Sequence, residues 1–163
     1  HGGETNFCDG IRAYESLAAD IKREIQGLSA IHSAGKPYTK ECVGAGGGSN
    51  RTMTLLPSDK AWDVQAHPIV RSHPETGRQS LWVNPLYTIG IEGYNERGSQ
   101  QLLNNLFTHM IDERFIYRHR WEPNMLLFWD NRSVLHNASG GYDGHRRVLH
   151  RLTIAGGQPK SPS

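Results

Sequence analysis

One histidine and two arginines near the C-terminus are the residues whose types and spacing could do chemistry. The segment WDNRSVLHNASGGYDGHRRVLHR, residues 129–151, contains His136 and, after a glycine-rich gap, Arg147 and Arg151. A neutral imidazole is a common metal ligand, so His136 is a candidate for metal binding. A lone histidine on a strand face is more often a packing residue, so His136 alone does not identify a site.

The two arginines give the segment a second chemical property. If residues 146–156, RRVLHRLTIAG, form a strand, Arg147 and Arg151 are four positions apart and project from the same face. Buried cations require anionic partners, and the planar guanidinium group suits carboxylates, phosphates and sulfonates. Each arginine could instead pair with an Asp or Glu of the protein. A histidine strand followed by a return strand with an anion-binding arginine suits a metal held near an acidic cosubstrate.

Helices and turns are predicted in the first two thirds of the chain. In residues 9–28 the apolar residues recur with helical spacing, and Asp9 or Ser16 could cap a helix start. The clearest amphipathic helix is predicted over residues 99–113. Residues 67–85 predict a hairpin with its turn at residues 74–77. Residues 35–52, with a glycine-rich run at 44–50, predict a mobile surface loop of a kind that often closes over a site.

The last third of the chain predicts strands. RFIYRHRW, residues 114–121, alternates so that Phe115, Tyr117, His119 and Trp121 share one face. Further strands are expected at residues 126–130, 133–138 and 146–156. Many short strands with helices before and between them indicate an antiparallel β sandwich or barrel decorated by helices.

Length, charge and cysteine content restrict the class of protein. A chain of 163 residues fits a single domain over residues 1–163. The net charge of +2 is too small to indicate a nucleic-acid or membrane partner, and no apolar run of about 18 residues is present. Only Cys8 and Cys42 occur, without a CxxC pair, which fits a reducing, cytoplasmic compartment.

Three motifs in the same order resemble one known family. They are GGETNFCD near the N-terminus, HPIVRSHPETGRQSLWVNP in the middle, and WDNRSVLHNASGGYDGHRRVLHRLTIAG at the C-terminal end. Together they are similar to the TauD/TfdA family of Fe(II)- and 2-oxoglutarate-dependent dioxygenases. The resemblance implies a mostly β fold with helices around a double-stranded β-helix core, the jelly roll or cupin-like core. It also implies Fe(II) as metal, 2-oxoglutarate and O2 as cosubstrates, and a homo-oligomer.

The resemblance assigns a role to each matching residue. His136, in the WDNRxxxH motif, matches the distal histidine ligand of a two-histidine, one-carboxylate iron site. Arg147 matches the arginine that binds the remote carboxylate of 2-oxoglutarate, and Thr5 matches a threonine that helps to hold it. Arg151 matches the arginine that faces the anionic group of the substrate, and Tyr87 stands where an aromatic residue lines the substrate pocket. Tyr87 could equally be a packing residue.

The resemblance also implies two iron ligands that this sequence does not contain. In the family a His-x-Asp pair lies about two dozen residues before the GGxT motif, and no His-x-Asp occurs here. We therefore expect the chain to be the C-terminal portion of a longer dioxygenase domain. The expected reaction is oxidation of a small anionic organic substrate, with a sulfonate such as taurine favoured and succinate and CO2 released. A sulfate ester or an aryloxyalkanoate remains open as the substrate.

Three other interpretations remain open at this point. A catalytically inactive family member or binding module would keep the fold without the full iron triad. Nucleic-acid binding through the basic and aromatic RFIYRHRW segment would use the rings as stacking platforms. A zinc site could be built from His136, His145 and His150, although His150 and Arg151 would point in opposite directions on a strand.

Overall fold

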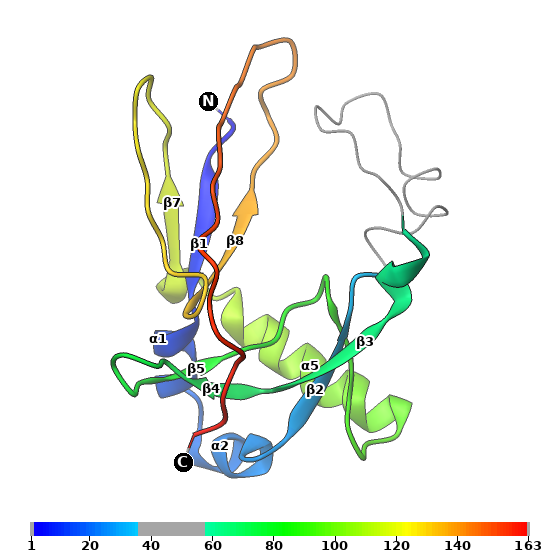
Figure 1. Ribbon diagram of the computed structural model, residues 1–163. Coiled ribbons are helices and arrows are strands. Elements are labelled where there is room, and N and C mark those ends of the chain that lie inside the picture. The colour runs from blue at the N-terminus through cyan, green and yellow to red at the C-terminus, as the bar shows by residue number, and fades with distance from the viewer. Residues whose placement is uncertain (1, 36–57, 163) are drawn as a thin grey trace.

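The computed structural model describes residues 2–35 and 58–162, and its strands form three antiparallel sheets (Figure 1). The elements in chain order are β1 (Thr5–Asp9), α1 (Gly10–Glu15), α2 (Ala19–Ile25), β2 (Ser29–Ser33), the 3-10 helix η1 (Asp59–Trp62), β3 (Val64–Pro68), β4 (Val70–Ser72), β5 (Gln79–Leu81), β6 (Thr88–Ile91), α5 (Glu96–Met110), the 3-10 helix η2 (Glu113–Phe115), β7 (Ile116–His119) and β8 (Val134–Ala138).

The sheet β7-β1-β8 joins the N-terminal strand to two strands from the last third of the chain. On one side of β1, Thr5 lies opposite His119, and on the other side Phe7 lies opposite His136. Because successive side chains of a strand point to opposite faces, Thr5, Phe7 and His136 share one face, and Cys8 lies on the other. The Cys8 face belongs to the hydrophobic core.

The other two sheets lie beside the first and come from the middle of the chain. The order is β3-β2-β6 in one sheet, and β4 pairs with β5 in the other. The hairpin predicted over residues 67–85 is confirmed, since Ser72 lies opposite Gln79 and the turn closes with Gly77 N donating to His73 O at 2.8 Å. Gly77 has a φ of +69°, a conformation that glycine adopts at no steric cost.

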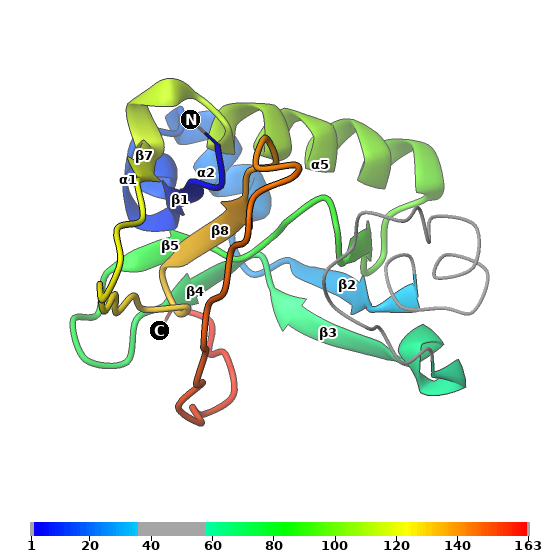
Figure 2. The ribbon, with the colours of Figure 1, turned by 90° about the horizontal axis from the view of Figure 1, so that it is seen from above.

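Helix α5 confirms the amphipathic helix expected over residues 99–113, beginning three residues earlier and ending three residues sooner. The Asn95 side chain caps it by accepting from Gly98 N at 2.8 Å. Its buried side chains are Ser99, Leu102, Leu103, Leu106 and Met110. Figure 2 shows α5 along one edge of the molecule, with β1, β7 and β8 near its C-terminal end.

The helices expected within residues 9–28 are also present. Asp9 caps α1 by accepting from Ile11 N and Arg12 N, both at 3.0 Å. Ser16 does not begin a helix; it ends α1, and α2 begins after Ala18. In the described part of the chain, no helix is long and apolar enough to cross a membrane.

Two of the strands expected near the C-terminus are absent from the described sheets. Residues 126–130 and 146–156 have no assigned helix or strand, whereas the strand expected at residues 133–138 is confirmed as β8. The prediction of strands at 126–130 and 146–156 was wrong for this chain, because a strand also needs a partner for its backbone groups. Their apolar side chains are largely exposed: Leu126 78%, Phe128 78%, Leu152 98% and Ile154 89%.

The shared face predicted for RFIYRHRW is only partly correct. Tyr117 and His119 do share a face in β7, and the ring of His119 lies 4.8 Å from that of Trp121. Phe115 departs from this pattern, because it ends the 3-10 turn η2 and packs in the core. Of the loop predicted at 35–52, including its glycine-rich run at 44–50, all but Gly35 lies outside the described residues.

The packing of α5 gives a stability prediction. Leu106 is 1% exposed in the core, so Leu106→Ala is expected to lower the free energy of unfolding of the full-length protein by about 2–5 kcal/mol. Asn104→Ala, on the exposed side of the same helix, is the control and should change it by less than about 0.5 kcal/mol. Urea denaturation measures both. Similar small effects of the two substitutions would contradict the packing described for α5.

Candidate active site

His136 stands in the middle of β8, between aromatic rings. Its ring centroid lies 6.2 Å from that of Phe7 and 5.2 Å from that of Trp129, and its side chain is exposed. Partial burial lowers the pKa of His136, and the positive charge of Arg151 lowers it further. The imidazole is therefore held in its neutral form, which is the form that binds a metal ion.

Thr5 lies on the same sheet face, two residues along β1 from Phe7, which pairs with His136. It is buried, opposite Ala138 in β8, and its Oγ1 accepts from Trp121 Nε1 at 2.9 Å. The register of β1 with β8 therefore brings Thr5 and His136 together although they are far apart in sequence. This juxtaposition agrees with the roles that the family resemblance assigns to them.

Arg147 reaches the N-terminal end of β1 from the segment that follows β8. Its Nη2 donates to Gly3 O at 3.0 Å, and its guanidinium lies 5.3 Å from the centroid of the Tyr142 ring. Gly3 is required here, because its φ is +75° and a Cβ would come within 3.1 Å of Arg147 Nε. Arg147 thus lies over the backbone that leads into Thr5.

A basic cavity surrounds Arg147. It has a volume of about 410 Å³ and is lined by Arg120, Arg146, Arg147 and His145, among others, with Glu4 as an acidic residue. Several guanidinium groups around one cavity favour an anionic ligand such as a carboxylate. Trp121, which donates to Thr5, also lines it, so the cavity lies next to Thr5.

Arg151 and Tyr87 are the other two residues predicted for the candidate site. Arg151 is exposed, and it lies near enough to His136 for its charge to lower the pKa of that imidazole. Arg147 and Arg151 do not share a strand face, contrary to the prediction, because residues 146–156 form no strand here. Tyr87 is half-buried beside the sheet β3-β2-β6, where its backbone O accepts from Ser33 N at 2.9 Å.

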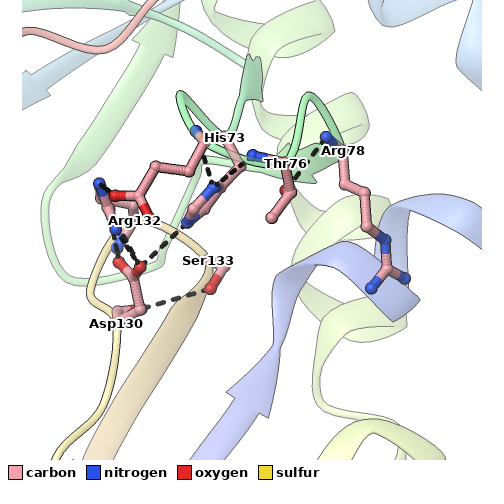
Figure 3. A network of polar contacts seen from close by, with 7 residues as sticks. His73, Thr76, Arg78, Asp130, Arg132 and Ser133 are labelled. Atoms are coloured by element: carbon pink, nitrogen blue, oxygen red, sulfur yellow. Dashed lines mark hydrogen bonds and ion pairs between the residues drawn. The ribbon is translucent and has the colours of Figure 1, made fainter.

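A polar network around Asp130 was not predicted from the sequence (Figure 3). Asp130 Oδ2 lies 2.9 Å from His73 Nε2 and 2.6 Å from Arg132 Nη2, and Arg132 Nη1 donates to Glu75 Oε1 at 2.8 Å. The hydrogen bonds from Arg132, followed by the one from His73, hold the pKa of Asp130 well below its ordinary value. The signal was present in the HPETGR and WDNR motifs, but their contact spans 57 positions and leaves no periodic pattern.

The sequence contains one His-x-Glu pair, His73-Pro74-Glu75, which resembles the missing ligand pair in spacing. Both side chains are engaged in the Asp130 network, with His73 on Asp130 and Glu75 on Arg132. These two side chains therefore connect the β4–β5 hairpin to the WDNR turn.

Among the described residues, His136 fits one ligand position of an iron site. His136 supplies a neutral imidazole, which suits Fe(II). Within residues 2–35 and 58–162, no group of three or more His, Cys, Asp and Glu side chains is arranged to hold a metal ion. That result removes the alternative zinc site of His136, His145 and His150, all of which are described. It also means that any iron site needs ligands besides those described.

Comparison with known proteins identifies the family of this chain. The family model for "Taurine catabolism dioxygenase TauD, TfdA family" matches residues 1–153. The chain is 35% identical over 155 residues to an alpha-ketoglutarate-dependent 2,4-dichlorophenoxyacetate dioxygenase of Burkholderia sp. (strain RASC), covering 95% of this chain and 49% of the relative. It is also 35% identical over 155 residues to a putative alpha-ketoglutarate-dependent sulfonate dioxygenase of Schizosaccharomyces pombe (strain 972 / ATCC 24843), covering 94% of this chain and 37% of the relative.

Solved structures show the same fold. A taurine dioxygenase from Burkholderia xenovorans matches 85% of this chain and 41% of its own, with a TM-score of 0.67 and 32% identity. AAD-2, solved with Mn(II) and N-oxalylglycine, matches 97% of this chain and 59% of its own, with a TM-score of 0.75 and 27% identity. The expected fold class, a mostly β jelly-roll core with helices, is confirmed.

The chain belongs to the TauD/TfdA family. It spans about half the length of the first relative, and less of the second.

The low pKa of Asp130 predicts a pH-dependent effect of Asp130→Asn in the full-length protein. A carboxylate whose folded pKa lies below the unfolded value of about 3.9 stabilises the fold above that pH and loses its effect as the pH falls further. The difference in free energy of unfolding between wild type and Asp130→Asn should therefore be largest near neutral pH and shrink below about pH 4. Urea denaturation at pH 7 and pH 3 measures it.

Glu15→Gln is the control for this experiment. It removes an ion pair with Arg78 in which both side chains are 52% exposed, so it should cost less than about 1 kcal/mol. An Asp130→Asn effect of equal size at pH 7 and pH 3 would contradict the assignment of a charged Asp130 in the folded state.

Proposed function

We propose that the full-length protein is an Fe(II)- and 2-oxoglutarate-dependent dioxygenase that hydroxylates a small anionic substrate and releases succinate and CO2. The observation that carries the proposal is the β1–β8 register, which puts Thr5 and His136 on one sheet face, with Arg147 at the end of that face. Three residues that the family resemblance assigned to iron and cosubstrate therefore converge from separate parts of the chain. Family membership supports the same reaction class.

Each residue has a distinct role in the proposed site. When bound, the ferrous ion supplies the activation of O2 that couples 2-oxoglutarate decarboxylation to substrate oxidation. His136 is one of its ligands. Arg147 binds the remote carboxylate of 2-oxoglutarate, for which the basic cavity provides positive charge. The Thr5 hydroxyl, oriented by the Trp121 indole N–H, holds the same cosubstrate.

The other two iron ligands would come from a part of the protein outside this chain. We propose that residues 1–163 are the C-terminal portion of the dioxygenase domain and that a His-x-Asp pair lies in the remainder. The relatives, about twice as long or more, support this division. The exposed side chains of Leu126, Phe128, Leu152 and Ile154 support it too, since large apolar side chains on one surface fit a place where further protein packs.

The substrate proposal rests on Arg151. Its exposed guanidinium near His136 suits a substrate with a small acidic group. We favour a sulfonate such as taurine, which would place the protein in taurine catabolism, and the relative described as a putative sulfonate dioxygenase supports that class. A relative named for 2,4-dichlorophenoxyacetate keeps an aryloxyalkanoate open. Tyr87 is proposed to line the substrate pocket.

The proposal also includes the setting of the enzyme. We propose a cytoplasmic homo-oligomer with no nucleic-acid or membrane partner. The cysteine content and mild net charge support this setting. Arg118, a cation of the RFIYRHRW segment, is already engaged by Glu113, with Nη1 donating to Oε2 at 2.6 Å, which disfavours a phosphate-binding role for it.

A catalytically inactive family member or binding module is the second candidate, favoured by the single iron ligand among the described residues. Oxygen uptake by the full-length protein with Fe(II), 2-oxoglutarate and candidate sulfonates separates the two. The dioxygenase proposal expects one succinate formed for each 2-oxoglutarate consumed, dependent on iron. No consumption of 2-oxoglutarate under any of these conditions would favour the inactive alternative.

The two arginines should affect different ligands in the full-length protein. Arg147→Ala removes a charge-assisted contact worth about 1.5–3 kcal/mol, so the concentration of 2-oxoglutarate needed should rise by about tenfold or more. Arg151→Ala should chiefly weaken binding of the anionic substrate. Steady-state kinetics with each ligand varied in turn measures both effects.

Arg97→Ala is the matched control, since it removes one exposed arginine from α5. It should leave both concentration dependences within about twofold of wild type, as expected for an exposed surface position. Equal effects of Arg147→Ala and Arg151→Ala on both ligands would refute this division of roles.

A further inference from the structure

We propose that Asp130 and His73 form a positioning pair, which fixes the point where β8 begins and thereby holds His136 on the metal-facing side of the sheet. The pair connects the WDNR turn, which leads into β8, to the β4–β5 hairpin (Figure 3). The expected effect on metal binding rests on the proposed function, whereas the expected effect on the position of β8 does not.

The hydrogen bonds around His73 define its tautomer. Its Nδ1 accepts from Glu75 N and Thr76 N, both at 3.3 Å, so the proton of the neutral ring resides on Nε2. That Nε2–H donates to Asp130 Oδ2 at 2.9 Å. The His73 side chain is only 8% exposed, so its orientation is fixed by packing as well as by three hydrogen bonds. His73 is therefore a rigid donor aimed at Asp130.

Asp130 in turn organises the turn before β8. Its Oδ1 accepts from Arg132 N at 2.8 Å, and its backbone O accepts from Ser133 N and Val134 N, both at 3.1 Å. Val134 is the first residue of β8. One residue thus binds the hairpin with its side chain and the first residue of β8 with its backbone.

The start of β8 is also held by α1. Gly10 N donates to Ser133 O at 2.9 Å, and a Cβ at Gly10 would come within 2.9 Å of that oxygen and 2.7 Å of Ser80 Oγ in β5. The backbone approach is therefore too close for any side chain at this glycine. Gly10 of α1 thus approaches both β5 and the residue before β8, and Asp130 is the polar link between the start of β8 and the β4–β5 hairpin.

This placement matters because the side-chain period of a strand is two. A shift of β8 by one residue along β1 would turn His136 to the opposite face, away from Thr5. The register is specified by five residue pairs, from Asp9↔Val134 to Thr5↔Ala138, and the Asp130 link lies just before the first of them. A link at that end opposes both slippage and fraying of β8.

The experiment compares His73→Leu, which removes the donor to Asp130, with Asp130→Asn and the double substitution in the full-length protein. Glu75→Gln is the matched control, because Glu75 contacts the outer side of Arg132 with a side chain that is 71% exposed, and the substitution leaves the His73–Asp130 bond in place. Two readouts are measured: amide hydrogen exchange of β8 relative to α5, and the affinity for Mn(II) as a probe of the iron site.

The proposal expects faster exchange in β8 with α5 unchanged, and about tenfold weaker Mn(II) binding, as for other residues that orient a metal ligand through an intermediate. The double substitution should be no worse than Asp130→Asn alone, because Asp130→Asn already removes the charge-assisted bond to His73. Glu75→Gln should resemble wild type. His73→Leu carries the test if Asp130→Asn fails to fold, since it leaves the bonds between Asp130 and Arg132 intact.

Either of two results would overturn the proposal. One is Mn(II) affinity within twofold of wild type in His73→Leu. The other is an equal rise of exchange in β8 and α5, which would show general destabilisation. If wild-type protein binds no Mn(II), the proposed function fails, and the exchange measurement alone decides whether the pair positions β8.

Discussion

The antiparallel register of β1 between β7 and β8 is the constraint on which the rest of the site depends. It places Thr5 two residues along the ladder from the Phe7–His136 pair, although more than a hundred residues separate β1 from β7 and β8 in sequence. Because directly opposite residues share a face, this register alone decides whether the imidazole and the hydroxyl point to the same side. Arg147 then meets that side through the Gly3 backbone, where only a glycine leaves enough room.

Two sets of contacts support this register: packing on one face of the sheet and bonds at the start of β8. The Cys8 side packs on the core with α5, and the start of β8 is held by Gly10 of α1 and by the Asp130 network. The opposite face carries the site and is less covered. His136 is exposed there, and residues 126–130 and 146–156 form no helix or strand. A rigid, packed side and an open, polar side are what a sheet needs to present ligands to a metal and a small acid.

The sequence predicted the elements whose signals are local. The period of Leu102, Leu103, Leu106 and Met110 predicted α5, and alternation predicted β8 with His136 on it. Short runs rich in apolar residues also predicted strands at 126–130 and 146–156, which was wrong here, because a strand exists only with a partner and a local pattern does not supply one. Phe115 was assigned to the wrong face because a 3-10 turn changes the direction of side chains just before β7.

The motif resemblance identified the residues of the candidate site from the sequence. Their closeness in space depends on the register of β1 with β8, which no local sequence pattern could predict.

The most direct test of the proposed site is calorimetric titration of N-oxalylglycine, a stand-in for 2-oxoglutarate, into the full-length protein with and without Mn(II). If iron and cosubstrate bind on this face of the sheet, N-oxalylglycine should bind the wild type only when the metal is present, and His136→Ala should abolish the binding. Metal-independent binding that His136→Ala leaves unchanged would contradict the placement of iron and cosubstrate on this face of the sheet.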